Sequence, residues 1–92
     1  MSTPATSFRL RVYTPARELI DTQVQSVTAE GAYGQIGVLP DHAALVTVLE
    51  PGVLTYREVK GNTIRLQLGG GFAEVRDNVM TVLADSGEQL AA

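Results

Sequence analysis

Apolar residues recur at every second position over much of this 92-residue chain, and that period constrains the fold class. In the first clear example, Phe8, Leu10 and Val12 fall on one side of an extended segment, and Arg9 and Arg11 fall on the other. Alternation of this kind is typical of a strand with one buried face and one solvated face. We therefore expect strands in place of amphipathic helices.

Further segments with the same period, or rich in β-branched residues, predict more strands. They are residues 19–20, 24–30, 38–39, 45–49, 53–59, 63–68, 72–75 and 79–84, the last of which we expect to end the fold. Turn residues separate them, and Asp77-Asn78 is a predicted two-residue hairpin loop. The spacing predicts an all-antiparallel sandwich or barrel, and we favour one antiparallel β-sandwich of about ten short strands. We place this domain at residues 8–85, between a flexible N-terminal tail (1–7) and a short C-terminal tail (86–92).

The composition excludes several classes of function. Seven basic and ten acidic residues give a net charge of −3, which argues against a nucleic-acid-binding surface. The chain has no cysteine and one histidine, so it contains no disulfide, no thiolate nucleophile and no multi-histidine metal site. We find no signal peptide and no apolar run near the roughly 20 residues of a membrane span. We expect a soluble chain that inserts into no membrane and meets one only through a partner.

Residues that could carry chemistry are few and isolated. His42 is the only histidine, and its neighbour Asp41 would point to the opposite face of an extended chain, so we favour a packed or interface histidine. The triple glycine at 69–71 lacks the lysine and hydroxyl of a phosphate-binding loop and precedes a strand, which favours a bulge or sharp bend. The acidic residues are scattered singly. We expect no catalytic residue, no metal and no cofactor.

Residues 31–47 are unusually apolar for a region with three glycines in its first seven positions. Some of these side chains are expected to fill the core. The others indicate a docking surface, because contiguous exposed apolar area on a small domain usually marks a partner.

The chain resembles the epsilon subunit of F-type ATP synthases, named delta in mitochondria. The resemblance rests on several short motifs in a fixed order across residues 8–85. They are Thr14-Pro15-Ala16-Arg17, then Gly31-Ala32-Tyr33-Gly34-Gln35-Ile36-Gly37-Val38-Leu39-Pro40-Asp41-His42-Ala43, Pro51-Gly52, Leu68-Gly69-Gly70-Gly71-Phe72-Ala73-Glu74-Val75 and Val82-Leu83-Ala84-Asp85.

The resemblance implies a ten-stranded sandwich in the central stalk, a non-catalytic rotor part that joins the gamma subunit to the membrane c-ring and couples ion translocation to ATP synthesis. It places the complex at the cytoplasmic face of the bacterial plasma membrane. By analogy, the c-ring contact falls on Gly31, Ala32, Tyr33, Gly34, Gln35 and Ile36. The gamma-subunit contact falls on His42, Leu45, Val46 and Thr47.

Two departures from the family pattern stand out. Ala44 occupies a position where many members have proline. The family also continues into a two-helix hairpin that can inhibit hydrolysis and in some bacteria binds ATP, whereas only seven residues follow Asp85 here. Seven residues cannot form an independent helix pair. We therefore expect neither hairpin-mediated inhibition nor nucleotide binding of this chain.

Two alternatives from other classes stay open. A stand-alone β-sandwich could bind a small ligand such as a sugar, but such a site needs clustered aromatic residues. The alternation of side chains along the predicted strands does not bring the five aromatic residues together. A small hydrolase could use His42 with an acidic residue.

Overall fold

The structure is a computed structural model that describes residues 5–91. Residues 1–4 of the expected N-terminal tail lie outside the described residues, as does Ala92 of the C-terminal tail. The strands are β1 (Phe8–Tyr13), β2 (Glu18–Gly31), β3 (Gly34–Val38), β4 (Leu45–Leu49), β5 (Gly52–Glu58), β6 (Thr63–Leu68), β7 (Gly71–Arg76), β8 (Val79–Ala84) and β9 (Gly87–Gln89). Nine strands and no helix in this part of the chain agree with the predicted all-β class.

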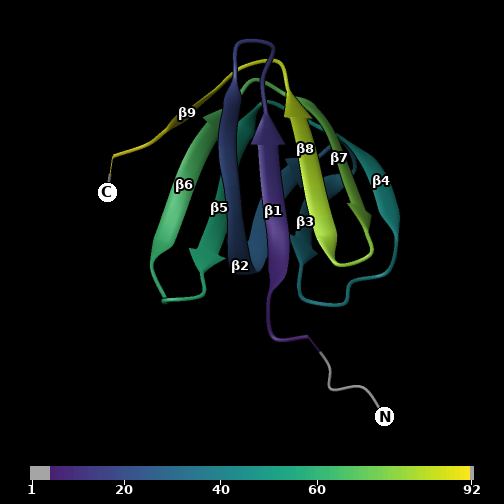
Figure 1. The fold of residues 1–92 in the computed structure, drawn as a ribbon. Helices are drawn as coiled ribbons and strands as arrows, with labels where there is room; N and C mark the ends of the chain where they lie inside the picture. The colour runs from purple at the N-terminus through teal and green to yellow at the C-terminus, as the bar shows by residue number, and fades with distance from the viewer. Residues whose placement is uncertain (1–4, 92) are drawn as a thin grey trace.

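The strands form one hydrogen-bonded sheet that folds over into two layers (Figure 1). Along the sheet the order is β1-β8-β7-β4-β2-β5-β6-β9, with β3 attached to β2. β1 also pairs with β2, so β1, β8, β7, β4 and β2 close into a ring. The closed arrangement leaves few free strand edges, which are the usual sites of unwanted strand pairing.

The long strand β2 joins the two layers. Its first part, up to Val24, pairs with β1. Its later part pairs with β5 from Val24 onward and with β3 from Val27 onward. The register shifts between Val24 and Ser26, where an irregularity lets the strand bend from one layer to the other. We predict two separate strands here, at 19–20 and 24–30, but the structure makes them one, because residues 21–23 pair with β1 through the backbone.

The core lies between the layers and is entirely apolar in the described residues. Phe8, Leu10 and Val12 are buried, as their alternation predicts, and Met80 and Val82 of β8 pack in the same cluster. At about 25 cal/mol per Å² of apolar surface removed from water, this cluster is the main stabilising contribution in so small a domain.

Two expectations about the pairing need correction. The β-sandwich is confirmed, but it is not all-antiparallel, because β1 runs parallel to β8, with Leu10 opposite Met80. The strand at 79–84 is not the last one. Residues 87–89, assigned above to a tail, form β9, which pairs with β6 from Leu66 to Leu68. The β9 residues are polar or glycine, so they show no apolar alternation that would predict a strand. Backbone hydrogen bonds to β6 hold β9 in place.

The loops at one end of the sandwich are tied together by Asn78. Asp77 and Asn78 both adopt positive φ (53° and 62°), which confirms the two-residue hairpin loop between β7 and β8. The Asn78 side-chain amide donates to the Ser7 carbonyl oxygen (2.8 Å), and its oxygen accepts from the Asp41 N–H (2.9 Å). The Asp41 carboxylate in turn accepts from the Ala5 N–H (2.8 Å). These bonds fix the 39–44 loop beside β8.

The triple glycine forms a bend, as predicted. Gly70 and Gly71 have φ values of 98° and 150°, and the chain passes from β6 to β7 at this point. A Cβ atom at Gly71 would overlap the Leu83 carbonyl oxygen of the neighbouring strand. The glycine is therefore needed both for its backbone conformation and for the close approach of β8.

Candidate docking surface

Residues 5–91 were first considered as ligands for a metal ion and as partners of His42. No three carboxylate or histidine side chains come together there to hold a metal ion. The His42 Nδ1 atom lies 2.7 Å from the carbonyl oxygen of the adjacent Ala43, and no carboxylate hydrogen-bonds to the ring. The arrangement of a nucleophile with an oriented base is therefore not present at His42.

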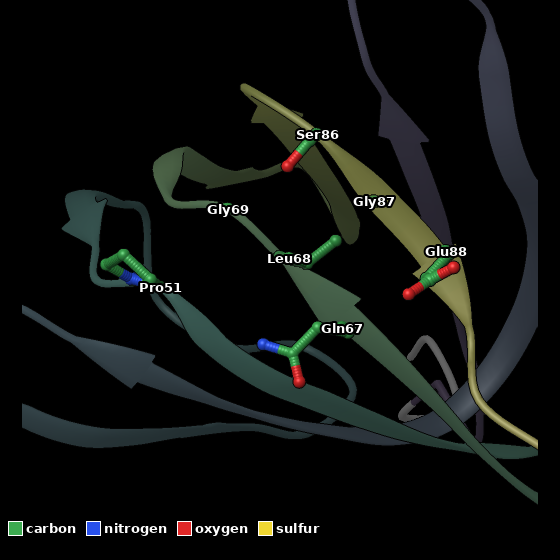
Figure 2. A pocket seen from close by; sticks show the side chains of 7 residues that line it. All are labelled: Pro51, Gln67, Leu68, Gly69, Ser86, Gly87 and Glu88. Carbon is green, nitrogen blue, oxygen red and sulfur yellow. The ribbon is translucent and has the colours of Figure 1, made fainter.

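A hollow of about 420 Å³, drawn in Figure 2, also lacks a catalytic arrangement in its lining. It is lined by Pro51, Gln67, Leu68, Gly69, Ser86, Gly87 and Glu88. Figure 2 shows Ser86 and Glu88 on either side of Gly87 along the chain, and none of the residues that line the hollow is a histidine, lysine or cysteine. An activated serine needs such a base beside it.

A row of exposed apolar side chains lies on the solvent-facing surface of β1, β8, β7 and β4. We name this surface the outer face. Tyr13, Leu83, Phe72 and Val48 occupy successive register positions on these four strands. We name these four side chains the apolar row. Phe72, Leu83 and Val48 expose 57%, 56% and 46% of their area, although each is a large apolar side chain.

A second line of side chains runs beside the apolar row. Arg11, Thr81, Glu74 and Val46 are register neighbours on the same strands, and Val46 exposes 71% of its area. A shallow hollow of about 260 Å³ separates the two lines, bounded by Phe72, Leu83 and Val46 among others. An apolar row beside a hollow and flanked by polar groups has the composition of a protein-binding site.

The charged residues of the outer face begin directly beside the apolar row. Arg11 and Glu74 stand in the second line, and Arg9 and Arg76 lie one register step farther from the row. Arg9 makes a forked ion pair with Asp21, with donor–acceptor distances of 2.7 and 2.6 Å. The hydrogen bond from Arg9 lowers the pKa of the Asp21 carboxyl, and the charge of Arg11 adds to the effect. The guanidinium carbon of Arg11 lies 5.2 Å from the centre of the Tyr13 ring, which is cation–π geometry.

A tight turn projects from the sandwich close to the apolar row. Ala32 and Tyr33 connect β2 to β3, and the Tyr33 side chain is fully exposed. Gly34 follows with a φ of 122°, a conformation that favours glycine. The Ala32 N–H donates to the carbonyl oxygen of Val48, so the turn is fixed directly to the strand that carries one end of the apolar row.

Comparison with known proteins defines the family. Residues 7–90 match the model of the ATP synthase delta/epsilon chain β-sandwich domain. The chain is 44% identical over 85 residues to the ATP synthase epsilon chain of Carboxydothermus hydrogenoformans, a match that covers 92% of this chain and 63% of that protein. It is 42% identical over 81 residues to the epsilon chain of Pelotomaculum thermopropionicum, covering 88% and 60% of the two chains.

The chain belongs to the ATP synthase delta/epsilon family. The resemblance found in the sequence motifs is thereby confirmed. The chain spans about three fifths of the length of these curated relatives.

Solved structures agree with the fold assigned to this delta/epsilon-family chain. A chain in the cryo-EM structure of the Euglena gracilis mitochondrial ATP synthase superposes with a TM-score of 0.88 at 24% identity, covering 96% of this chain and 56% of that one. A chain in the Tetrahymena thermophila mitochondrial ATP synthase structure, described as central stalk and c-ring, gives 0.75 at 24% identity, covering 94% and 69%. At this identity the likeness establishes the sandwich fold.

The residues that the family resemblance assigns to the c-ring lie at the end of β2, in the projecting turn and at the start of β3. Ala32, Tyr33, Gly34 and Gln35 are exposed at the turn. Gly31 is buried, and Ile36 packs against the core. The structure thus brings four of these six residues to one exposed tip, and a c-ring contact there stays a prediction.

The residues that the resemblance assigns to the gamma subunit do not share one face. Val46 points outward beside the apolar row, whereas Leu45 packs against the core from the other side of β4. Thr47 is half-buried on the same side as Leu45, and His42 is half-buried in the preceding loop. Only Val46 of the four is therefore part of the outer face.

The apolar row itself is the feature that the sequence motifs did not single out. Phe72 and Leu83 lie inside two of the family motifs, but the resemblance assigns neither of them to a contact. The five aromatic residues form no cluster, although Tyr13 and Phe72 do share the outer face, with Leu83 of β8 between them. The row arises because β1 and β4, from earlier parts of the chain, pair on either side of the β7–β8 hairpin.

No helix in residues 5–91 combines the length and the apolar character that crossing a bilayer requires.

Proposed function

We propose that this chain forms the β-sandwich part of a non-catalytic rotor subunit in the central stalk of an F-type ATP synthase. It joins the gamma subunit to the membrane c-ring, and so couples ion translocation to ATP synthesis at the catalytic sites of other subunits. The family match supports this role. The complex would hold the chain at the cytoplasmic face of a bacterial plasma membrane.

The observation that carries the proposal is the apolar row on the outer face. Phe72, Leu83 and Val48 expose large apolar areas side by side on three adjacent strands, where a free domain would gain by covering them. The gamma subunit is the partner that we assign to this face. Val46, which the resemblance assigns to gamma, lies next to the apolar row and supports the choice.

The exposed turn at Ala32 and Tyr33 is assigned to the c-ring. Its backbone is fixed to Val48 of β4, so the turn and the outer face belong to one rigid body. A closely packed apolar core resists shear, which suits a part that transmits torque between two partners. The chain needs no cofactor for this mechanical role.

Co-purification with the gamma subunit tests the proposal. The chain and gamma are produced together, gamma is captured through a tag, and the amount of this chain that accompanies it is measured. We expect a stoichiometric complex that Leu83→Ser disrupts. Val59→Ser is the matched control, because Val59 exposes a similar fraction of its area outside the outer face. Absence of the complex, or its survival in Leu83→Ser, would refute the assignment of gamma to this face.

A further inference from the structure

Three arginines lie on the outer face, and one of them differs from the others. Arg9, Arg11 and Arg76 all project outward from β1 and β7. Arg9 is held by the forked ion pair with Asp21, and the Arg76 Nε lies 3.7 Å from a carboxylate oxygen of Asp77. Arg11 makes no ion pair with any residue that the structure describes.

Arg11 has no carboxylate partner in the part of the chain that the structure describes, although its neighbour in the sheet is an aspartate. In the pairing of β1 with β2, Asp21 lies directly opposite Arg11, yet its carboxylate binds Arg9 instead. The Arg11 guanidinium turns toward the Tyr13 ring, at the end of the apolar row. Its Nε atom is covered and has no acceptor among residues 5–91. A cation is thus held at the border of the apolar row with unused hydrogen-bonding capacity.

Covering the apolar row with a partner would remove water from this cation. A guanidinium that loses its hydration without gaining an anion opposes binding, because burial of an unpaired charge is strongly unfavourable. A carboxylate from the partner removes that cost, and arginine binds carboxylates through two parallel hydrogen bonds. The outer face itself does not supply this carboxylate. Glu74 is separated from Arg11 by the strand that carries Thr81, and the two side chains form no ion pair.

We propose that Arg11 is a specificity-determining residue of the outer face, and that the partner covering the apolar row presents a carboxylate side chain to its guanidinium. This inference rests on the proposed function, in which that partner is the gamma subunit. It assigns to the partner surface an apolar strip with an acidic residue at the end that covers Tyr13.

The test measures the affinity of the purified gamma subunit for Arg11→Met at low and high salt. Methionine keeps an unbranched stem over the sheet but removes the charge. We expect at least about a tenfold loss of affinity at low salt, in line with the loss of one partner of a covered charge pair, and a weaker dependence of affinity on salt. Arg65→Met on β6 is the control, because it makes the same change of net charge away from the outer face. It is expected to keep wild-type affinity and salt dependence.

The variant Phe72→Ser, measured together with the two arginine variants, distinguishes the docking of gamma on the apolar row from the carboxylate contact with Arg11. If Phe72→Ser abolishes binding while Arg11→Met binds like the wild type, or more tightly, the carboxylate inference is overturned and the docking of gamma stands. If Phe72→Ser also binds like the wild type, both are overturned. Matching urea midpoints for all the variants confirm that differences in affinity do not come from unfolding.

Discussion

The backbone N–H of Ala32 donates a 3.0 Å hydrogen bond to the carbonyl oxygen of Val48. Ala32 belongs to the exposed turn assigned to the c-ring, and Val48 belongs to the apolar row assigned to gamma. A second bond, from the Glu50 N–H to the Glu30 carbonyl oxygen, fixes the same two segments to each other. The two proposed contacts are therefore joined by main-chain bonds, with no flexible loop between them.

Substitution of the turn residue Tyr33 separates the two contacts. Tyr33→Ser removes a fully exposed aromatic ring, so we expect unchanged stability within about 0.5 kcal/mol and unchanged affinity for gamma. Attachment of the complex to membranes that contain the c-ring is expected to weaken. The measurement is the fraction of the soluble head released from vesicles by washing, with Val59→Ser as the control. Equal release from both variants would contradict a ring contact at this turn.

Neighbouring residues on β4 are expected to respond in opposite ways. Val46→Ser removes an outward side chain, so the affinity for gamma should fall by at least about fivefold with little change in stability. Leu45→Ser places a hydroxyl against the core and should lower the free energy of unfolding by about 2 kcal/mol. Urea denaturation and a binding titration on both variants check the pattern. A loss of affinity in a fully folded Leu45→Ser, with none in Val46→Ser, would show that the face is wrongly assigned.

The bend before β7 depends on glycine at one position. Gly71→Ala forces a side chain into a φ of 150° and against the Leu83 carbonyl oxygen, and we expect a loss on the order of 3 kcal/mol in the free energy of unfolding. Gly37→Ala is the control, since a Cβ atom there meets nothing within 4 Å, and its effect should stay within about 0.5 kcal/mol. Chemical denaturation measures both. Equal stability of the two variants would exclude the close approach of β7 and β8.

The Arg9–Asp21 ion pair predicts a specific dependence of stability on pH. The hydrogen bond from Arg9 lowers the pKa of Asp21 in the folded state below the value of about 3.9 in an unfolded chain. The pair therefore stabilises the fold above about pH 4, and this contribution is lost as the pH falls through the lower folded-state pKa. We expect the coupling between Arg9→Met and Asp21→Asn, measured in a double-mutant cycle, to be favourable at pH 7 and to vanish at low pH. A coupling that is unchanged at pH 2, or absent at pH 7, would contradict this.

Much of the sandwich follows from local pattern. The alternation of Phe8, Leu10 and Val12, the strands at 45–49 and 63–68 and the Asp77-Asn78 loop are all as predicted. What local pattern misses depends on pairing between distant segments. The polar residues 21–23 and 87–89 become strand because β1 and β6 offer them backbone partners. The parallel pairing of β1 with β8 has no local signal at all.

The sequence does not reveal the outer face, for a related reason. The strand at 79–84 carries apolar residues on both sides, so its sequence cannot tell Val82, which is buried, from Leu83, which is exposed. The distinction needs the neighbours that each side meets in the sheet. The family resemblance assigns residues 31–36 to the c-ring, and four of these six residues are exposed at the turn. It also groups Leu45 with Val46, which point to opposite sides of β4.

Titration calorimetry of the purified gamma subunit into this chain, repeated at several temperatures, tests the central claim most directly. Burial of apolar surface on binding gives a negative heat-capacity change. We predict such a change for the wild type and loss of measurable binding in the double variant Phe72→Ser/Leu83→Ser, with urea midpoints equal to wild type because both side chains are more than half exposed. Binding by the folded double variant with wild-type affinity and the same heat-capacity change would contradict the claim that gamma covers the apolar row.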